Sequence, residues 1–129
     1  MKTIERFANP VSPHEGGPPY SRAVGWGDLI FVSGQVAIDE NGSPVEGDII
    51  AETRQTIENL RKVLNDLGLD LQHVIKTMVW LTDVGDFDIF NKIYVEYFGQ
   101  ALPARACVRA DLMGPFRIEI EAIASRQVR

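Results

Sequence analysis

The chain has 129 residues, of which 45% are hydrophobic and 24% charged, and its formal net charge is −5. These values fit one soluble globular domain over residues 1–129. The negative charge disfavours nucleic acid as a partner. No apolar run approaches the length of a membrane helix, and the first residues lack the apolar core of a secretory signal.

Cysteine and histidine content narrows the chemistry further. Cys107 is the single cysteine, so no disulfide can form within one chain and a reducing, cytoplasmic location is expected. His14 and His73 lie far apart, with no cysteine or carboxylate pattern around them. We therefore expect neither a metal nor a cofactor.

The N-terminal third is predicted to contain strands and turns. Residues 1–7 are expected to form an edge strand, and residues 9–19, rich in proline and glycine, a loop. Residues 20–26 and 29–33 predict a hairpin about a Gly27-Asp28 turn.

Gly34 interrupts the strand that begins at residue 29. Alternation resumes over residues 36–38, and Asn41-Gly42 predicts another turn. The interruption fits either a plain bulge or a place where the backbone approaches a ligand closely.

Two later segments have helical periodicity. Residues 48–67 place apolar side chains on one face, with Asp48 as the expected N-cap and Gly68 as the stop. Residues 87–98 carry an aromatic stripe typical of a core-facing helix, and Asp86 is its expected N-cap.

Residues 75–82, 104–110 and 116–124 alternate as strands. The last two are predicted to be antiparallel neighbours joined by a loop over residues 111–115. Opposed residues of such neighbours share a sheet face, and burial of the apolar side forbids a one-residue slip. We therefore expect one face to carry a cluster of charged residues and the thiol: Arg105, Cys107, Arg109, Arg117, Glu119 and Glu121.

That face has two interpretations. It is either a solvated surface with cross-strand ion pairs, or a site. In a site, Arg binds a carboxylate with a planar fork, and a nearby Glu handles a proton or a water.

The order of elements predicts an α+β fold, mostly one sheet with two amphipathic helices packed on its apolar face. The other face is expected to be partly polar and to meet either water or another subunit.

Several motifs resemble the RidA (YjgF-type) family of enamine/imine deaminases, and the resemblance covers nearly the whole chain. They are Val32-Ser-Gly-Gln, the Lys76-Thr-x-Val-Trp-Leu-x-Asp strand, the Asn91-x-x-Tyr-x-x-Tyr-Phe helix, the Pro103-x-Arg-Ala-x-Val strand and Ile118-Glu-Ile-Glu-Ala-Ile-Ala. The resemblance implies a chorismate-mutase-like fold, one mixed sheet with two helices on one face. It also implies a homotrimer with active sites in the clefts between subunits.

The resemblance further implies site residues. Arg105 matches the arginine that anchors the substrate carboxylate, and Glu119 the glutamate that positions water, with Glu121 as the second candidate. Cys107 matches the position whose backbone N–H assists the carboxylate. Tyr20, Ser33 and Gly34 match residues that complete the pocket.

The implied activity is that of a 2-iminobutanoate/2-iminopropanoate deaminase, which hydrolyses reactive imines to 2-keto acids and ammonia. The loop over residues 111–115 departs from the family pattern in length and residues. Arg109 and Arg117 are extra charges that would suit a second carboxylate, as in an aminomuconate-like enamine. An endoribonuclease is disfavoured by the acidic balance and the lack of a histidine pair. A non-catalytic protein that binds small carboxylates would also fit the same residues.

Overall fold

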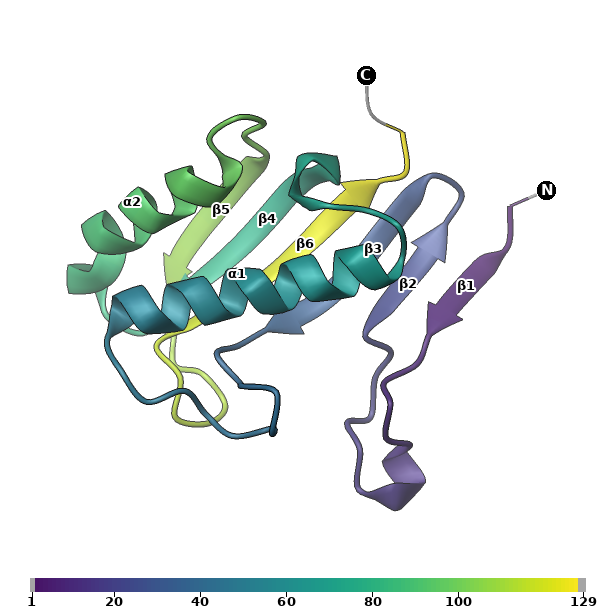
Figure 1. Ribbon diagram of the computed structural model, residues 1–129, viewed down its shortest axis with the longest axis horizontal. Helices are drawn as coiled ribbons and strands as arrows, with labels where there is room; N and C mark the ends of the chain where they lie inside the picture. Colours follow the sequence, from purple (N-terminus) through teal and green to yellow (C-terminus); the bar gives the residue numbers. More distant parts are fainter. Residues whose placement is uncertain (1, 128–129) are drawn as a thin grey trace.

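The computed structural model describes residues 2–127 and contains one mixed, six-stranded sheet with two α-helices (Figure 1). The elements follow in the order β1 (Ile4–Phe7), η1 (Pro13–Glu15), β2 (Ala23–Trp26), β3 (Leu29–Gln35), α1 (Ile49–Asp66), η2 (Leu71–His73), β4 (Val74–Leu81), η3 (Val84–Asp86), α2 (Phe87–Phe98), β5 (Ala104–Arg109) and β6 (Ile118–Ser125). The expected fold class is confirmed. Both helices cover the same face of the sheet, and no helix in residues 2–127 is long and apolar enough to span a membrane.

The strand order corrects one expectation. The sheet runs β1-β2-β3-β6-β4-β5, so β6 pairs with β3 and β4 and does not touch β5. The predicted hairpin of residues 104–110 and 116–124 is therefore wrong. β5 instead lies parallel to β4 at the sheet edge, because α2 provides the crossover that a parallel pair requires.

The core lies between the helices and the sheet. In β6 the even-numbered residues Ile118, Ile120, Ala122 and Ala124 are buried, as the alternation predicts. They pack with Ile57, Leu60 and Leu64 of α1 and with the aromatic stripe of α2, which includes Phe90, Tyr94 and Phe98.

The helix ends follow the sequence only in part. The Asp48 side chain accepts from Ala51 N at 3.0 Å and caps α1, and Gly68 takes the left-handed φ of 78° that the stop requires. Asp86 precedes α2 but makes no side-chain cap. The Asp83 carboxylate caps η3 instead, accepting from Gly85 N at 2.8 Å, and Asp86 is buried beside an arginine.

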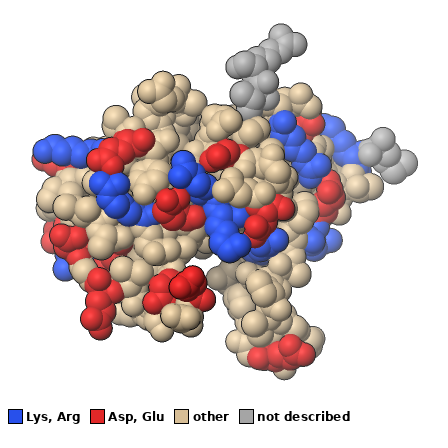
Figure 2. All heavy atoms as spheres, viewed as in Figure 1, with Lys and Arg blue, Asp and Glu red and all other residues tan. Residues whose placement is uncertain are grey.

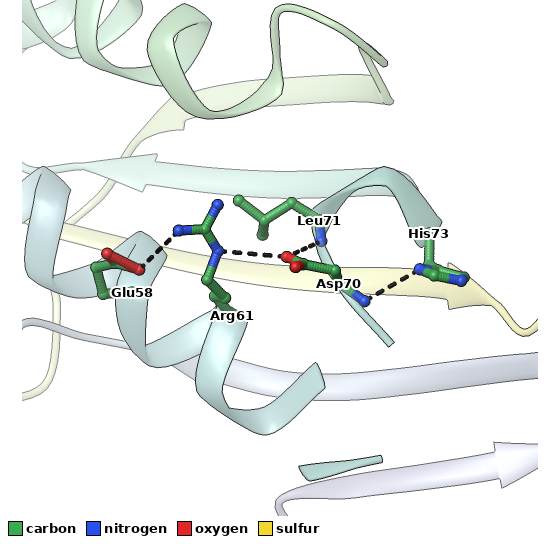
Figure 3. Close-up of polar contacts among 5 residues, drawn as sticks. All are labelled: Glu58, Arg61, Asp70, Leu71 and His73. Carbon is green, nitrogen blue, oxygen red and sulfur yellow. Dashed lines mark hydrogen bonds and ion pairs between the residues drawn. The ribbon is translucent and has the colours of Figure 1, made fainter. Parts of the chain in front are cut away.

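The turn between α1 and β4 is held by a polar network (Figure 3). Arg61 bridges Glu58 at 3.2 Å and Asp70 at 3.3 Å, and the Asp70 carboxylate accepts from Leu71 N at 2.7 Å. Asp70 N in turn donates to His73 Nδ1 at 3.0 Å. His73 therefore has a local structural role.

The face without helices is more apolar than the sequence predicts. The strand registers place Glu119 and Glu121 on this face, among side chains that are mostly large and apolar: Ile4, Val24, Trp26, Phe31, Met78, Trp80 and Ile123. Ile4, Trp26 and Phe31 are exposed in the single chain. An exposed apolar surface of this kind is typical of a face that another protein covers.

Arg117 compensates two buried carboxylates from different elements. Its backbone N–H donates to Glu52 Oε1 at 2.9 Å, and its guanidinium lies 3.5 Å from Glu52 Oε2 and 3.7 Å from Asp86 Oδ2. The side chains of Glu52 and Asp86 are only 6% and 13% exposed, whereas that of Arg117 is 49% exposed. Arg117 thus joins the start of β6 to α1 and η3.

Arg117→Met is expected to lower the free energy of unfolding by about 2 kcal/mol, because it leaves two buried carboxylates without a cation that is itself half exposed. Arg54→Met is the matched control. Arg54 is exposed to a similar extent and pairs with Glu96 at 2.7 Å, but the Glu96 carboxylate is 53% exposed, so loss of this arginine should cost less than about 1 kcal/mol. Urea unfolding measures both, and equal costs would contradict this role of Arg117.

Candidate functional site

The guanidinium of Arg105 packs against three aromatic side chains of α2. Its guanidinium carbon is 4.9 Å from the ring centroid of Tyr94, 5.4 Å from Phe90 and 5.8 Å from Phe87. Nη1 donates to Asn91 Oδ1 at 2.8 Å, the one hydrogen bond of this guanidinium to a residue in 2–127. A guanidinium carries five N–H donors, so this half-buried cation is oriented and can still bind a carboxylate.

The surroundings of Arg105 suit the binding of a carboxylate and do not favour Cys107 as a nucleophile. Burial raises the pKa of the Cys107 thiol, although the nearby charge of Arg105 opposes this shift. The thiol is therefore protonated at neutral pH and weakly nucleophilic. Burial also raises the pKa of Tyr94, whose hydroxyl lies 2.7 Å from Thr77 Oγ1, so the ring under Arg105 is neutral.

Glu119 occupies the helix-free face, in the middle of the sheet. It pairs across β4 with Trp80, and its carboxylate abuts the backbone of Gly34, where any Cβ would overlap it. Burial raises the pKa of Glu119, and the charge of Glu121 adds to the shift. A carboxyl group with a raised pKa can exchange protons with a substrate or a water nearer to neutral pH.

A bulge in β3 brings Gly34 to Glu119. The register with β6 shifts between Val32 and Gln35, so both sequence interpretations of Gly34 hold in part: it is a bulge, and it allows a close approach, though to a side chain of the same chain. Ser33 lies beside it, with Oγ donating to Ser21 O at 2.6 Å.

Tyr20 lies at the end of the proline-rich loop with an exposed side chain. Asn9 holds this loop by donating to Tyr20 O at 2.6 Å. Tyr20 and Gly34 both border a hollow of about 580 Å³ between β3 and α1. Arg105 and Glu119 do not line that hollow.

The structure separates two groups that the sequence placed on one face. Thr77 pairs with Arg105 in β5 and with the buried Ala122 in β6, so the odd-numbered residues of β5 lie on the helix-covered face. Glu119 and Glu121 lie on the opposite face. The expected face shared by Arg105, Cys107, Arg109, Arg117, Glu119 and Glu121 is therefore wrong, because it rested on pairing β5 with β6.

Arg117 and Asn91 have different roles in the structure from those that the sequence suggests. Arg117 is engaged with Glu52 and Asp86, away from Arg105. Asn91 and the rings that orient Arg105 were predicted only as family motif and core. Their helical spacing, with Asn91 one turn after Phe87, was the available signal. Within residues 2–127 no cluster of three or more His, Cys, Asp or Glu could hold a metal ion.

Comparisons with known proteins agree with one another. Residues 13–126 match the family model described as Endoribonuclease L-PSP. The chain is 44% identical to a RutC family protein of Pyrococcus abyssi over 84% of this chain and 87% of that one. It is also 44% identical to the 2-iminobutanoate/2-iminopropanoate deaminase of Mus musculus, over 82% and 80%. The crystal structure of NMB1025, a YjgF family member from Neisseria meningitidis, superposes with a TM-score of 0.80 at 31% identity and covers 98% of each chain.

In the single chain, where no second subunit brings a cation to it, Glu119→Gln is expected to raise the free energy of unfolding at pH 7, because the folded state raises the pKa of this carboxyl. Between the ordinary value of about 4.3 and the raised value, the folded chain binds more protons than the unfolded chain, so wild-type stability falls as pH rises. The gain should vanish below about pH 4, where both states bind the proton. Glu121→Gln should give part of the same gain in stability, because the charge of Glu121 contributes to the raised pKa of Glu119.

Urea unfolding at several pH values, at a protein concentration low enough to keep the chain monomeric, measures these differences. A gain that does not depend on pH would show that Glu119→Gln acts through packing and not through the charge.

Proposed function

Since the chain belongs to the RidA (YjgF-type) family, we propose that it hydrolyses small 2-imino acids and their enamine tautomers, as a 2-iminobutanoate/2-iminopropanoate deaminase does. The observation that carries this proposal is the half-buried guanidinium of Arg105, oriented by Asn91 and three aromatic rings. A planar, oriented fork suits the carboxylate of a 2-imino acid. The name of the mouse relative supports the same chemistry.

The proposed reaction converts an imine and water into a 2-keto acid and ammonia. Arg105 and the backbone N–H of Cys107 hold the substrate carboxylate. Glu119 accepts a proton from water as the water oxygen bonds to the imine carbon, and passes that proton to the imine nitrogen to give the neutral carbinolamine. Glu119 then takes the hydroxyl proton and passes it to the amino nitrogen as the C=O bond forms and the C–N bond breaks. Ammonia leaves and Glu119 ends as the carboxylate with which it began.

We further propose that the site is completed between subunits of a homotrimer. Arg105 and Glu119 lie on opposite faces of one sheet, so one chain cannot present both to a molecule as small as a 2-imino acid. Two features support a second copy as the partner. Among residues 2–127, β5 ends the sheet with an edge that no further strand pairs with, and the helix-free face exposes Trp26 and Phe31. A cyclic assembly that covers this face would bring Arg105 of one subunit to Glu119 of the next.

Endoribonuclease activity, which the matched family description names, has less support from the site. Figure 2 shows basic and acidic side chains interspersed over the helix-covered face. Several basic side chains there are paired with carboxylates, as in Arg22–Asp66 and Arg54–Glu96. This face, for the residues described, offers no continuous basic track for RNA phosphates. His73 is used in a local cap.

The direct test is keto-acid release from freshly generated 2-iminopropanoate. We expect acceleration over the spontaneous reaction by the wild type. Arg105→Ala should lower kcat/KM by about 100-fold or more, because the charge-assisted, two-pronged contact is lost. Arg61→Ala is the matched control, since Arg61 also lies over an aromatic ring, 5.6 Å from the centroid of Tyr97, but remote from β5.

A folded wild type without acceleration would contradict the deaminase proposal. Binding of the keto-acid product in that case would favour a carboxylate-binding protein. RNA cleavage lost in Arg105→Ala would favour the endoribonuclease.

A further inference from the structure

A small hollow lies beside Arg105, where the parallel strands β4 and β5 end. Its volume is about 210 Å³. Arg109 is the one charged residue of the lining, and the others are Leu81, Val84, Phe87, Cys107 and Val108. Val84 and Phe87 are 65% and 39% exposed. The walls come from β4, η3, α2 and β5, so regular elements position them.

The hollow continues directly from the proposed carboxylate anchor. Cys107 follows Arg105 by two residues on the same face of β5, a separation of about 6.6 Å along a strand. Phe87 belongs to both places, because its ring lies under the guanidinium of Arg105 and also lines the hollow. A molecule whose carboxylate is held at Arg105 and the Cys107 N–H therefore has this apolar space within reach of its side chain.

The size and chemistry of the hollow exceed what 2-iminopropanoate needs. A dry apolar cavity of about 150 Å³ can hold a benzene ring, whereas the side chain of this imine is one methyl group. Each methylene that fills an apolar pocket is worth roughly 10-fold or more in specificity. A branched aliphatic or aromatic side chain would fill the space and cover the exposed walls.

We propose that this hollow is the side-chain subsite of the enzyme, and that its preferred substrates are 2-imino acids with branched aliphatic or aromatic side chains. The proposal rests on the deaminase function and specifies its substrate class. Arg109 also lines the hollow, and its positive charge would instead favour a substrate with a second carboxylate.

The test compares imines generated in place from leucine, alanine and aspartate. In the wild type, kcat/KM for 4-methyl-2-iminopentanoate should exceed that for 2-iminopropanoate by about 10-fold or more. Val84→Trp, which narrows the hollow from an exposed turn, should lower this ratio by about 10-fold. Val95→Trp is the matched control: Val95 is 57% exposed on α2 outside the hollow, and the ratio should not change.

Two results would overturn the proposal: a ratio near one that Val84→Trp leaves unchanged, or a preference for 2-iminosuccinate that Arg109→Met removes. Calorimetric binding of 4-methyl-2-oxopentanoate and pyruvate gives an independent measurement. If no imine is hydrolysed, the deaminase proposal fails. Tighter binding of the larger keto acid, weakened by Val84→Trp, would still identify the hollow as a side-chain subsite, and equal binding would refute it.

Discussion

The insertion of β6 between β3 and β4 determines most of what this chain can do. Because β6 pairs with both strands, β5 reaches the sheet only as a parallel edge strand beyond β4. That position turns the odd-numbered residues of β5 toward α2 and those of β6 toward the helix-free face. Arg105 and Glu119 are thereby fixed on opposite faces of a rigid sheet.

The surroundings of Arg105 orient it to bind a carboxylate, and those of Glu119 raise its pKa, but neither group alone makes an active site. Arg105 packs against aromatic rings and is oriented by Asn91. Glu119 is held against the bulge at Gly34, with its pKa raised by burial and by Glu121. A cation without a carboxylate partner in 2–127 and a carboxyl group with a raised pKa are complementary. A second copy of the chain is the simplest means of bringing them together, and it would also cover Trp26 and Phe31.

Local features of the fold could be predicted from the sequence because their causes are local. The Asp48 cap, the Gly68 stop and the alternation of β6 depend on neighbouring residues alone, and all three are confirmed. The partner of β5 could not be predicted in this way. Alternation shows which residues of one strand share a face, but not which face of the sheet they occupy. Because β4 lies between β5 and β6, the odd-numbered residues of these two strands lie on opposite faces.

The candidate site shows the same division. Residue type and motif were enough to select Arg105, Glu119 and Gly34. The packing of Phe87, Phe90 and Tyr94 around Arg105 depends instead on where α2 crosses the sheet. Asp86 and Arg117 illustrate the reverse error. Their sequence positions suggested a cap and a substrate contact, whereas the fold places the half-exposed guanidinium of Arg117 3.7 Å from the buried carboxylate of Asp86.

In the proposed trimer, one active site needs Arg105 of one subunit and Glu119 of another. The most direct measurement mixes two inactive variants, Arg105→Ala and Glu119→Gln, by co-expression and assays imine hydrolysis. A shared site predicts recovery, with about a quarter of the sites restored when equal amounts assemble at random into a cyclic oligomer. A site contained within one chain predicts no recovery, and mixed oligomers that remain inactive, or an active single 14.4 kDa chain, would contradict the account.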